Sequence, residues 1–391
     1  FFQAGPEKKR LPPFAVAKVL PATHSFQILS QLFFEKNISY HKNTLYIKHI
    51  IPQKNPQQHQ HPIPSPTIPT RHPLLRNLLK IYFPRPKMSA KFIILQSSCP
   101  PKHKVSQKQT QNYCLTKKIL NKNMHIANPD ILETAIFQFS PELLETLLKD
   151  HTTQQNIFWG TSDYEHLGTG YDYDDPILPE LITGENGQVI MPRILKHKET
   201  QSARVRGMAE VFTPSWVCNA QINLIDEAWF GRKNVFNTEY IANDGTHAWQ
   251  TNSEKIQFPK EKTWKDYVCD TRLEITCGEA PYISSRYDTT TGTSIPLENR
   301  IGILDRKLRV VSENTSTSGE WLNAAQKAFK SVYAYEWQGD SLLLARESML
   351  YTFIEYYHAK FGKMPLRKSI NYIAYIISWN VWQMDGLKGV V

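Results

Sequence analysis

The sequence of 391 residues has no uncharged apolar run of about 18 residues, the minimum for a membrane-spanning helix. It also lacks any Cys-x-x-Cys pair, and nothing after Phe1 resembles a signal peptide. The five cysteines are Cys99, Cys114, Cys218, Cys269 and Cys277. Their odd number and scattered spacing argue against a disulfide scaffold or a zinc ribbon, and favour a reducing compartment. We therefore expect a cytoplasmic protein with no membrane partner.

The first 123 residues have almost no acidic residues, almost no glycine and no tryptophan. They hold 20 Lys and Arg but only Glu7 and Glu35, so that 20 − 2 gives +18. Residues 124–391 hold 26 Lys and Arg against 34 Asp and Glu, and 26 − 34 gives −8. The first segment has 15 of the 25 prolines but only Gly5 among the 17 glycines. The positive sign of the net charge of +10 therefore comes from the first third alone.

This first segment shows no sustained helical or strand period. Prolines at 62, 64, 66 and 69 remove backbone donors and exclude a helix or a central strand there. One interpretation is a basic arm that binds nucleic acid; the other is a disordered or non-native extension ahead of a true start at Met124. Because the basic residues are scattered rather than clustered, we expect the second.

From Met124 onward the pattern becomes that of a folded chain. Asn128-Pro129-Asp130 predicts the cap of a helix that extends to about residue 138. Ser140-Pro141-Glu142 predicts the start of a second helix, with proline in its first turn. The apolar stripe of that helix consists of Leu143, Leu144, Leu147 and Leu148.

Further along, helices are predicted at about 199–206 and 214–229, and residues 231–265 are polar and rich in turns. Strand and helix patterns then alternate to the end, which predicts an α/β fold with a parallel sheet behind a small helical region. We divide the chain into a basic extension (1–123), a helical region (124–208) and an α/β domain (209–391).

The strongest local signal is the stretch from Tyr267 to Ile283, interpreted as a strand, a tight turn and a helix. The strand ends in the acid Glu274, and the turn contains the small residues of Cys277-Gly278-Glu279-Ala280. Small residues at this point let a ligand approach the backbone closely. Taken alone, such a turn also fits plain architecture without a ligand.

Three other segments strengthen the ligand interpretation. Residues 332–336 predict a second strand that ends in Glu336, and an acid there can hold the two hydroxyls of a ribose. Asp385 is a third acid, after the apolar stretch 373–379. Upstream, Phe212-Thr213-Pro214 precedes a helix, with Thr213 expected to cap it and Pro214 in its first turn.

These four segments, in this order, resemble the γ-type amino-methyltransferases that methylate N6 of adenine in DNA. Phe212-Thr213-Pro214-Ser215-Trp216-Val217 is similar to the family's FTPxxV segment, and residues 274–282 to its turn after the first strand, with Ile275 and Ala280 as departures. More specifically, residues 124–391 look like the modification polypeptide of a bacterial restriction–modification system.

The resemblance implies a Rossmann-like class I sheet that binds S-adenosylmethionine. It assigns cofactor binding to Phe212, Thr213, Pro214, Glu274, Cys277, Gly278, Glu279, Ala280, Glu336 and Asp385. The family's catalytic tetrapeptide, Asn/Asp/Ser-Pro-Pro-Tyr/Phe, does not occur in the sequence. We therefore expect a C-terminally incomplete domain with no catalytic residues of its own. Double-stranded DNA would bind through further C-terminal parts, and a restriction or specificity subunit is a second partner that the resemblance allows.

Alternative functions stay open at this point. A bifunctional restriction endonuclease and methylase, or an inactive cofactor-binding relic, fits the same motifs. A nicotinamide-dependent oxidoreductase is disfavoured because GxGxxG is missing. Scattered histidines predict no metal site, and Cys277 is a packing residue rather than a nucleophile. The acidic run 163–175 fits a solvated loop better than a nuclease metal site.

Overall fold

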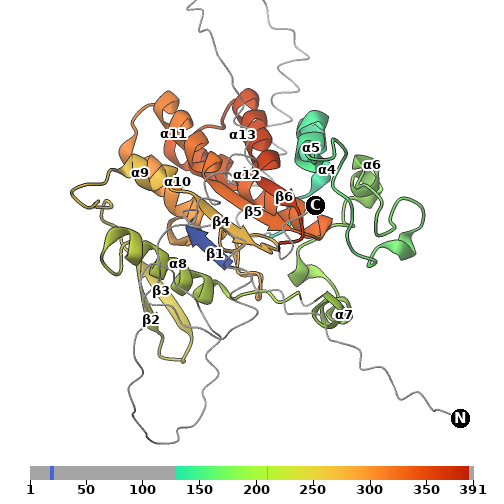
Figure 1. The fold of residues 1–391 in the computed structure, drawn as a ribbon, viewed down its shortest axis with the longest axis horizontal. Coiled ribbons are helices and arrows are strands. Elements are labelled where there is room, and N and C mark those ends of the chain that lie inside the picture. The colour runs from blue at the N-terminus through green and yellow to red at the C-terminus, as the bar shows by residue number, and fades with distance from the viewer. Residues whose placement is uncertain (1–17, 22–128, 209, 387–391) are drawn as a thin grey trace, which may run out of the picture. The chain divides into compact units, whose positions relative to one another are not determined.

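The computed structural model describes residues 18–21, 129–208 and 210–386, all within one compact unit of the chain. Its centre is a four-stranded sheet in the order β1-β4-β5-β6 (Figure 1). The strands are β1 (Lys18–Pro21), β4 (Arg272–Ile275), β5 (Val332–Glu336) and β6 (Val381–Gln383). The last three are parallel, and β1 pairs with β4 in the antiparallel direction. The predicted mixed α/β fold with a parallel sheet is confirmed.

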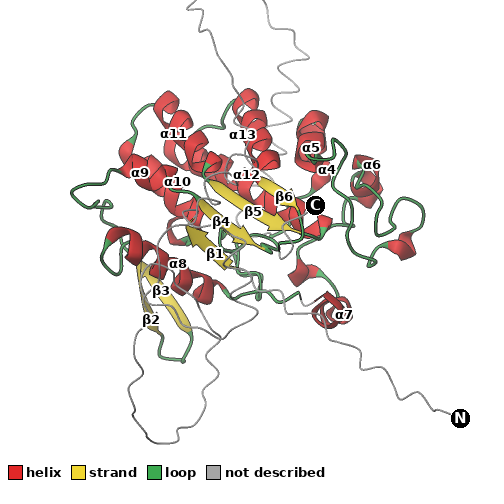
Figure 2. Ribbon diagram, viewed as in Figure 1, coloured by secondary structure: helices red, strands yellow, loops and turns green. Residues whose placement is uncertain are grey.

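The register puts alternate residues of β4, β5 and β6 on the same face of the sheet. Glu274 lies opposite Ala334 on β5, and Glu336 lies opposite Gln383 on β6, so Glu274 and Glu336 share one face. That face is buried under helices, which lie behind the strands in Figure 2. The other face carries the half-buried Tyr333, Tyr335 and Trp382. The Trp382 ring stacks on that of Tyr333 and is tilted against that of Tyr335.

Four helices surround the parallel strands. They are α10 (Ile303–Asn314), α11 (Ser318–Lys330), α12 (Gly339–Phe361) and α13 (Arg367–Asn380). The helix α12 contacts both β5 and β6 and is buried from its first residue to Tyr357. The apolar stretch 373–379 therefore belongs to a helix, and the strand that precedes Asp385 is the short β6.

The helical region before the sheet is close to the prediction. It contains α4 (Glu133–Phe139), α5 (Pro141–Leu148), α6 (Pro179–Ile182), α7 (Lys198–Met208) and the 3-10 turns η1 (Glu165–Leu167), η2 (Gly184–Asn186) and η3 (Arg193–Leu195). The four leucines of α5 are buried, as predicted, and α5 packs on α13. The predicted cap at residues 128–130 is wrong, because α4 begins at Glu133.

The backbone of the helical region is in direct contact with the sheet and with the start of α12. The Gly339 N–H donates to the Trp159 carbonyl over 2.8 Å, and a Cβ at Gly339 would lie 2.0 Å from the Phe158 carbonyl oxygen. The Gln383 side chain bonds both the N–H and the carbonyl of Phe158. A Cβ at Gly160 would similarly lie 2.7 Å from the Trp337 carbonyl oxygen. Only glycine fits at positions 160 and 339.

The segment between the FTP motif and β4 differs from the prediction in two places. After α8 (Ser215–Phe230), the region predicted to be merely polar and turn-rich forms a hairpin of β2 (Asn237–Ile241) and β3 (His247–Thr251). The residues that begin the predicted first strand form the helix α9 (Trp264–Cys269) instead. A capping box between Thr263 and Asp266 starts this helix. Cys269, the last residue of this helix, is consequently exposed.

The threonine-rich segment 288–318, which matches no family motif, has a structural role. The Asp288 carboxylate accepts hydrogen bonds from Thr290 and Thr291 in its own turn and from the Ser215 N–H at the start of α8 over 2.7 Å. The 3-10 turn η4 (Leu297–Asn299) then leads into α10. The predicted cap of α8 by Thr213 is wrong, since the distant Asp288 caps this helix.

The N-terminal extension lies mostly outside the described residues. Lys18–Pro21 are the exception: they form β1, although the extension was expected to be disordered. Within residues 18–21, 129–208 and 210–386, no helix combines the length and apolar content that crossing a bilayer requires.

Candidate functional site

The turn after β4 has an unusual backbone. Thr276, Gly278 and Ala280 have φ angles of 54°, 54° and 58°, so every second residue is left-handed. For Thr and Ala this conformation costs about 1–3 kcal/mol each. The turn is fixed to β5 by a hydrogen bond from the Cys277 N–H to the Tyr335 carbonyl at 2.8 Å. Strained backbone of this kind collects at functional sites, and here it aims N–H groups at the end of the neighbouring strand.

Glu336, at the end of β5, accepts a hydrogen bond from one N–H group of this turn, that of Gly278. Its carboxylate accepts hydrogen bonds from the backbone N–H of Gly278 at 2.7 Å, Trp337 at 3.0 Å and Gln338 at 3.1 Å. Burial raises the pKa of Glu336, and these three hydrogen bonds oppose the rise. The glycine turn and the second acid tip thus meet at one point, where neighbouring parallel strands end.

Glu274 is the other acid of this site, and unlike Glu336 it accepts no hydrogen bond from the described residues. Its side chain is completely buried, and neither oxygen has a hydrogen-bond partner within the described part of the chain. Burial raises the pKa of Glu274 well above its usual range, and the nearby Glu336 raises it further. A buried carboxyl group that has no hydrogen-bond partner among the described residues, beside a strained turn, can accept a cationic or hydroxyl-bearing ligand group.

The side chains of the remaining turn residues point into the protein. The Glu279 carboxylate accepts from the Arg193 N–H at 2.6 Å and the Tyr287 hydroxyl at 2.5 Å, and burial raises its pKa to about 7. Glu279 therefore anchors η3 in this structure. Cys277 and Ala280 are buried, and burial raises the pKa of the Cys277 thiol. A protonated thiol agrees with a packing role for Cys277.

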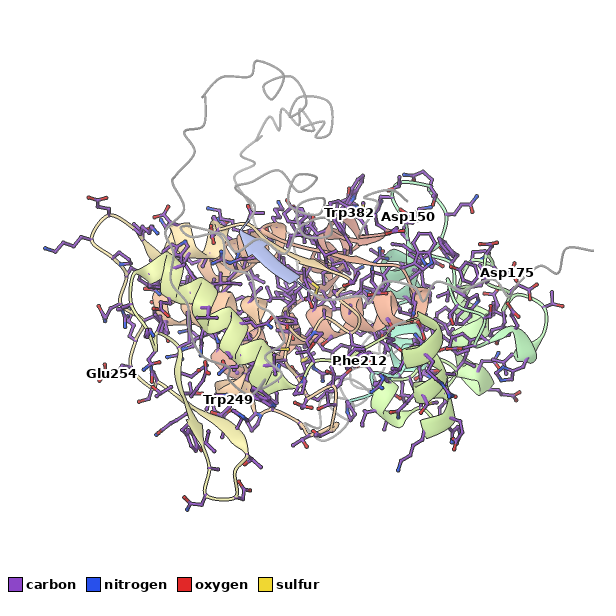
Figure 3. The ribbon with its side chains drawn as sticks, turned by 60° about the horizontal axis from the view of Figure 1, so that its bottom comes forward. Asp150, Asp175, Phe212, Trp249, Glu254 and Trp382 are labelled. Carbon is purple, nitrogen blue, oxygen red and sulfur yellow. The ribbon has the colours of Figure 1, made fainter. Side chains whose placement is uncertain are left out.

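The FTP segment lies across the turn. A Cβ at Gly278 would lie 3.8 Å from ring atoms of Phe212, and the Arg193 guanidinium lies 5.1 Å from the centre of the same ring. Figure 3 labels Phe212 between α8 and the helices of the N-terminal region. Thr213 contributes its carbonyl, which accepts from the Thr289 hydroxyl at 3.3 Å, and Pro214 directly precedes α8.

Asp385 follows β6 at the same edge of the sheet. The Met384 N–H donates to the Glu336 carbonyl at 3.0 Å, and a Cβ at Gly386 would lie 2.4 Å from Cγ2 of Ile275. The chain after β6 therefore crosses the ends of β5 and β4. Asp385 itself is half-buried. The structure brings the ten predicted residues to one region, and their binding of a cofactor stays a prediction.

Two residues near this site carry no motif signal. Gln338 and Asp340 follow Glu336 and contact Arg204 of α7, more than 130 residues earlier in the sequence. Nothing in the spacing of these residues predicts the contact, because it depends on how the helical region packs on the sheet.

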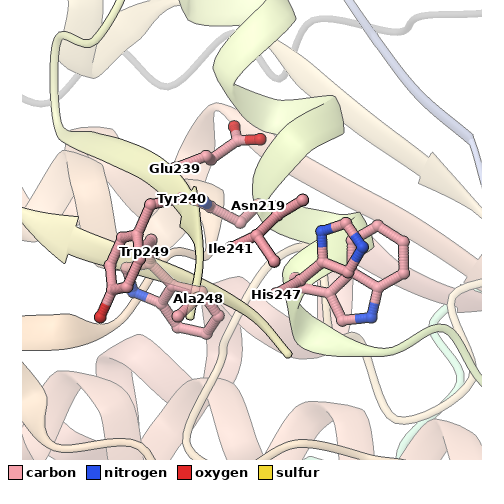
Figure 4. A pocket seen from close by; sticks show the side chains of 8 residues that line it. Asn219, Glu239, Tyr240, Ile241, His247, Ala248 and Trp249 are labelled. Carbon is pink, nitrogen blue, oxygen red and sulfur yellow. The ribbon is translucent and has the colours of Figure 1, made fainter. Parts of the chain in front are cut away.

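A cavity of about 180 Å³ lies elsewhere, between α8 and the β2–β3 hairpin (Figure 4). The rings of Trp216 and His247 stack at its edge, 3.9 Å apart. None of the ten predicted cofactor residues lines it.

The acidic run of residues 163–175 forms turns. Asp172 and Asp174 are exposed, and Asp163 forms an ion pair with Arg204 at 2.7 Å. Across the part of the chain that the structure describes, no three His, Cys, Asp or Glu side chains are grouped to hold a metal ion.

Comparisons with protein-family models, with curated proteins and with solved structures find no match to this chain.

Proposed function

We propose that this chain is the S-adenosylmethionine-binding part of a site-specific DNA adenine-N6 methyltransferase, built on a Rossmann-like class I sheet, in a cytoplasmic restriction–modification system. The observation that carries the proposal is the hydrogen bond from the Gly278 N–H to the Glu336 carboxylate. It joins a glycine turn after one parallel strand to an acid at the end of the next, which is the usual position for a nucleotide-like ligand in such a sheet.

The side chains present fit this cofactor. Glu336 would bind the ribose hydroxyls, and the unpartnered Glu274 would meet the cationic methionine end, under Phe212. Asp385, at the same edge, would meet the adenine amino group, as the sequence resemblance implies. When bound, S-adenosylmethionine supplies a methyl group on a sulfonium leaving group.

Methyl transfer by the chain as printed is not expected. The lone pair of adenine N6 is delocalised into the ring, so the amino hydrogens must be accepted and the base held about 3–3.5 Å from the methyl group. No Asn/Asp/Ser-Pro-Pro-Tyr/Phe segment is present to do this. A radiolabelled-methyl assay on adenine-rich duplex DNA tests the point: label in the DNA above background would contradict it.

The cofactor assignment is tested by calorimetric titration with S-adenosylmethionine. We expect Glu336→Gln to lower the affinity by about 1–3 kcal/mol, the contribution of hydrogen bonds to a charged group. Glu313→Gln is the matched control. Like Glu336, Glu313 accepts a backbone N–H, that of Ile256, but it is half-buried and pairs with Arg309. Equal affinity in both variants would remove Glu336 from the site.

The second candidate is a relic that no longer binds the cofactor. It is favoured by the closed state of the site, where Phe212 covers Gly278 and Gly386 lies against Ile275. Titration of the unmodified chain separates the candidates, because the relic gives no binding heat.

A further inference from the structure

Arg204, on α7, is a buried cation that connects four segments of the chain. Its guanidinium contacts Asp340 at 2.9 Å, Asp163 at 2.7 Å and Glu210 at 2.5 Å, and its side chain is inaccessible to solvent. Asp340 is held by a second cation as well, since Lys196 lies 2.7 Å away. The start of α12 and the end of α7 are therefore joined by charge-assisted hydrogen bonds in a water-free environment.

One further contact of Arg204 leads to the candidate site. The guanidinium donates to the side-chain oxygen of Gln338, and the backbone N–H of Gln338 donates to Glu336 at 3.1 Å. Trp337, between them, donates its own N–H to Glu336 at 3.0 Å. One residue, Gln338, thus links the Arg204 guanidinium to the Glu336 carboxylate, which in turn accepts the Gly278 N–H.

The same guanidinium also fixes the other side of the site. Glu210, which it contacts through Nε, lies two residues before Phe212, and the Phe212 ring covers Gly278. Arg204 therefore holds the loop that carries Glu336 and the segment that covers it.

We propose that Arg204 is a positioning residue, which sets the orientation of the Glu336 carboxylate through Gln338 and holds the Phe212 segment through Glu210. The inference rests on the proposed function only where it concerns the ligand; the positioning itself is a property of the free protein. Its consequence is that the N-terminal helical region, through α7, controls how tightly the ribose end of the cofactor is bound.

The experiment compares Arg204→Lys with Arg306→Lys in the full chain. Lysine keeps the charge but loses the planar fork that bonds several acceptors at once. Arg306 is an equally buried arginine, and within the described part of the chain its guanidinium bonds Asp226 and Asn219 on α8 rather than residues 336–340. Both changes therefore remove the same chemical group from a buried network, and only one network reaches Glu336.

The first measurement needs no ligand. Amide hydrogen exchange is followed at Gly278, Trp337 and Gln338, whose N–H groups bond Glu336. We expect faster exchange of these amides in Arg204→Lys than in the unmodified chain, and unchanged exchange in Arg306→Lys. Equal rates in the two variants would overturn the proposal.

The second measurement is the preference for ribose. Affinities are determined for S-adenosylmethionine and for its 2′-deoxy analogue, which lacks a hydroxyl that Glu336 would bind. We expect Arg204→Lys to reduce the preference for the ribose form by about tenfold, the value of one such hydrogen bond. If Arg204 had a purely structural role, its replacement would lower the affinity for both ligands equally, and that outcome would also overturn the proposal.

A third variant covers the case in which Arg204→Lys does not fold. Gln338→Met removes the side-chain oxygen of Gln338 that accepts from Arg204 and leaves the three ion pairs of Arg204 intact, so it should reproduce both effects. If the unmodified chain binds neither ligand, the proposed function fails, and the exchange rates of Gln338→Met and Arg306→Lys still decide whether the positioning is real.

Discussion

Two buried acids on α12 have entirely different partners. Asp340 and Glu347 are seven residues apart, hence on the same side of the helix, and both are completely buried. Asp340 has the two cations Arg204 and Lys196 within 2.9 Å. Neither oxygen of Glu347 has a hydrogen-bond partner among the described residues. Its strongest charge interaction is with another acid, Glu133 of α4, and Arg286 opposes this effect more weakly.

The pKa values of the two groups are consequently shifted in opposite directions. Burial alone would raise the pKa of Asp340, but Arg204 and Lys196 outweigh it and hold this pKa far below its usual range. Burial raises the pKa of Glu347 well above its usual range, and Glu133 raises it further. Burial therefore does not decide whether a carboxyl group is charged; its partners do. The first end of α12 is an ionic junction, and its middle holds an acid whose pKa is raised.

The largest effect is expected from breaking the ionic junction. Asp340→Asn leaves two buried cations with one anion fewer, and we expect the free energy of unfolding to fall by about 3–5 kcal/mol. Urea denaturation at pH 7 measures it. Asp163→Asn is the control: it removes an acid from the same arginine at a partly exposed position, and should lose less than about 1 kcal/mol. Similar losses in the two variants would mean that Asp340 is not the centre of the junction.

A smaller effect, of opposite sign, is expected from Glu347. Because its folded pKa is raised, the unfolded chain releases the proton first, and stability falls as the pH rises from about 4.5 toward the folded pKa. We expect Glu347→Gln to be more stable than the unmodified chain by about 1–3 kcal/mol at pH 8. The gain should vanish near pH 4, where both states carry the proton. A gain that does not depend on pH would show that folding does not shift the pKa of Glu347.

The smallest effect is expected for an exposed acid. Glu142 pairs with Arg367 at 2.8 Å, but both side chains are more than half exposed. Water and salt screen such a pair, so Glu142→Gln should leave the urea midpoint unchanged within error. A clear loss of stability would show that the exposed ion pair of Glu142 stabilises the fold, as the buried ion pairs of Asp340 are expected to do.

The sequence predicts the parts of this structure that depend on local patterns. The leucine spacing of α5 specifies its buried face, and the alternation from Val332 to Glu336 specifies β5, because burial on one face requires those periods. The order of the acids Glu274, Glu336 and Asp385 also predicts that they lie at one edge of the sheet, since parallel strands end together.

The parts that sequence reasoning missed depend on short or distant signals. The capping box at Thr263 and Asp266 identifies α9, but the apolar residues after it also fit a strand. Asn243-Asp244-Gly245 between two alternating runs is the one available signal for the hairpin. The contact of Arg204 with Asp340 and the capping of α8 by Asp288 join segments far apart in sequence, and no local pattern encodes them.

The two close backbone contacts at Gly160 and Gly339 give a criterion for recognising divergent relatives. At each position the neighbouring carbonyl leaves no room for a Cβ, and Gly160 also has a φ of 63°. Side chains around them can drift while volume and polarity are kept, but neither glycine can be replaced without moving a strand end. Sequences that have diverged beyond recognition should therefore still carry this pair, one glycine before the helical turns and one at the start of the long central helix.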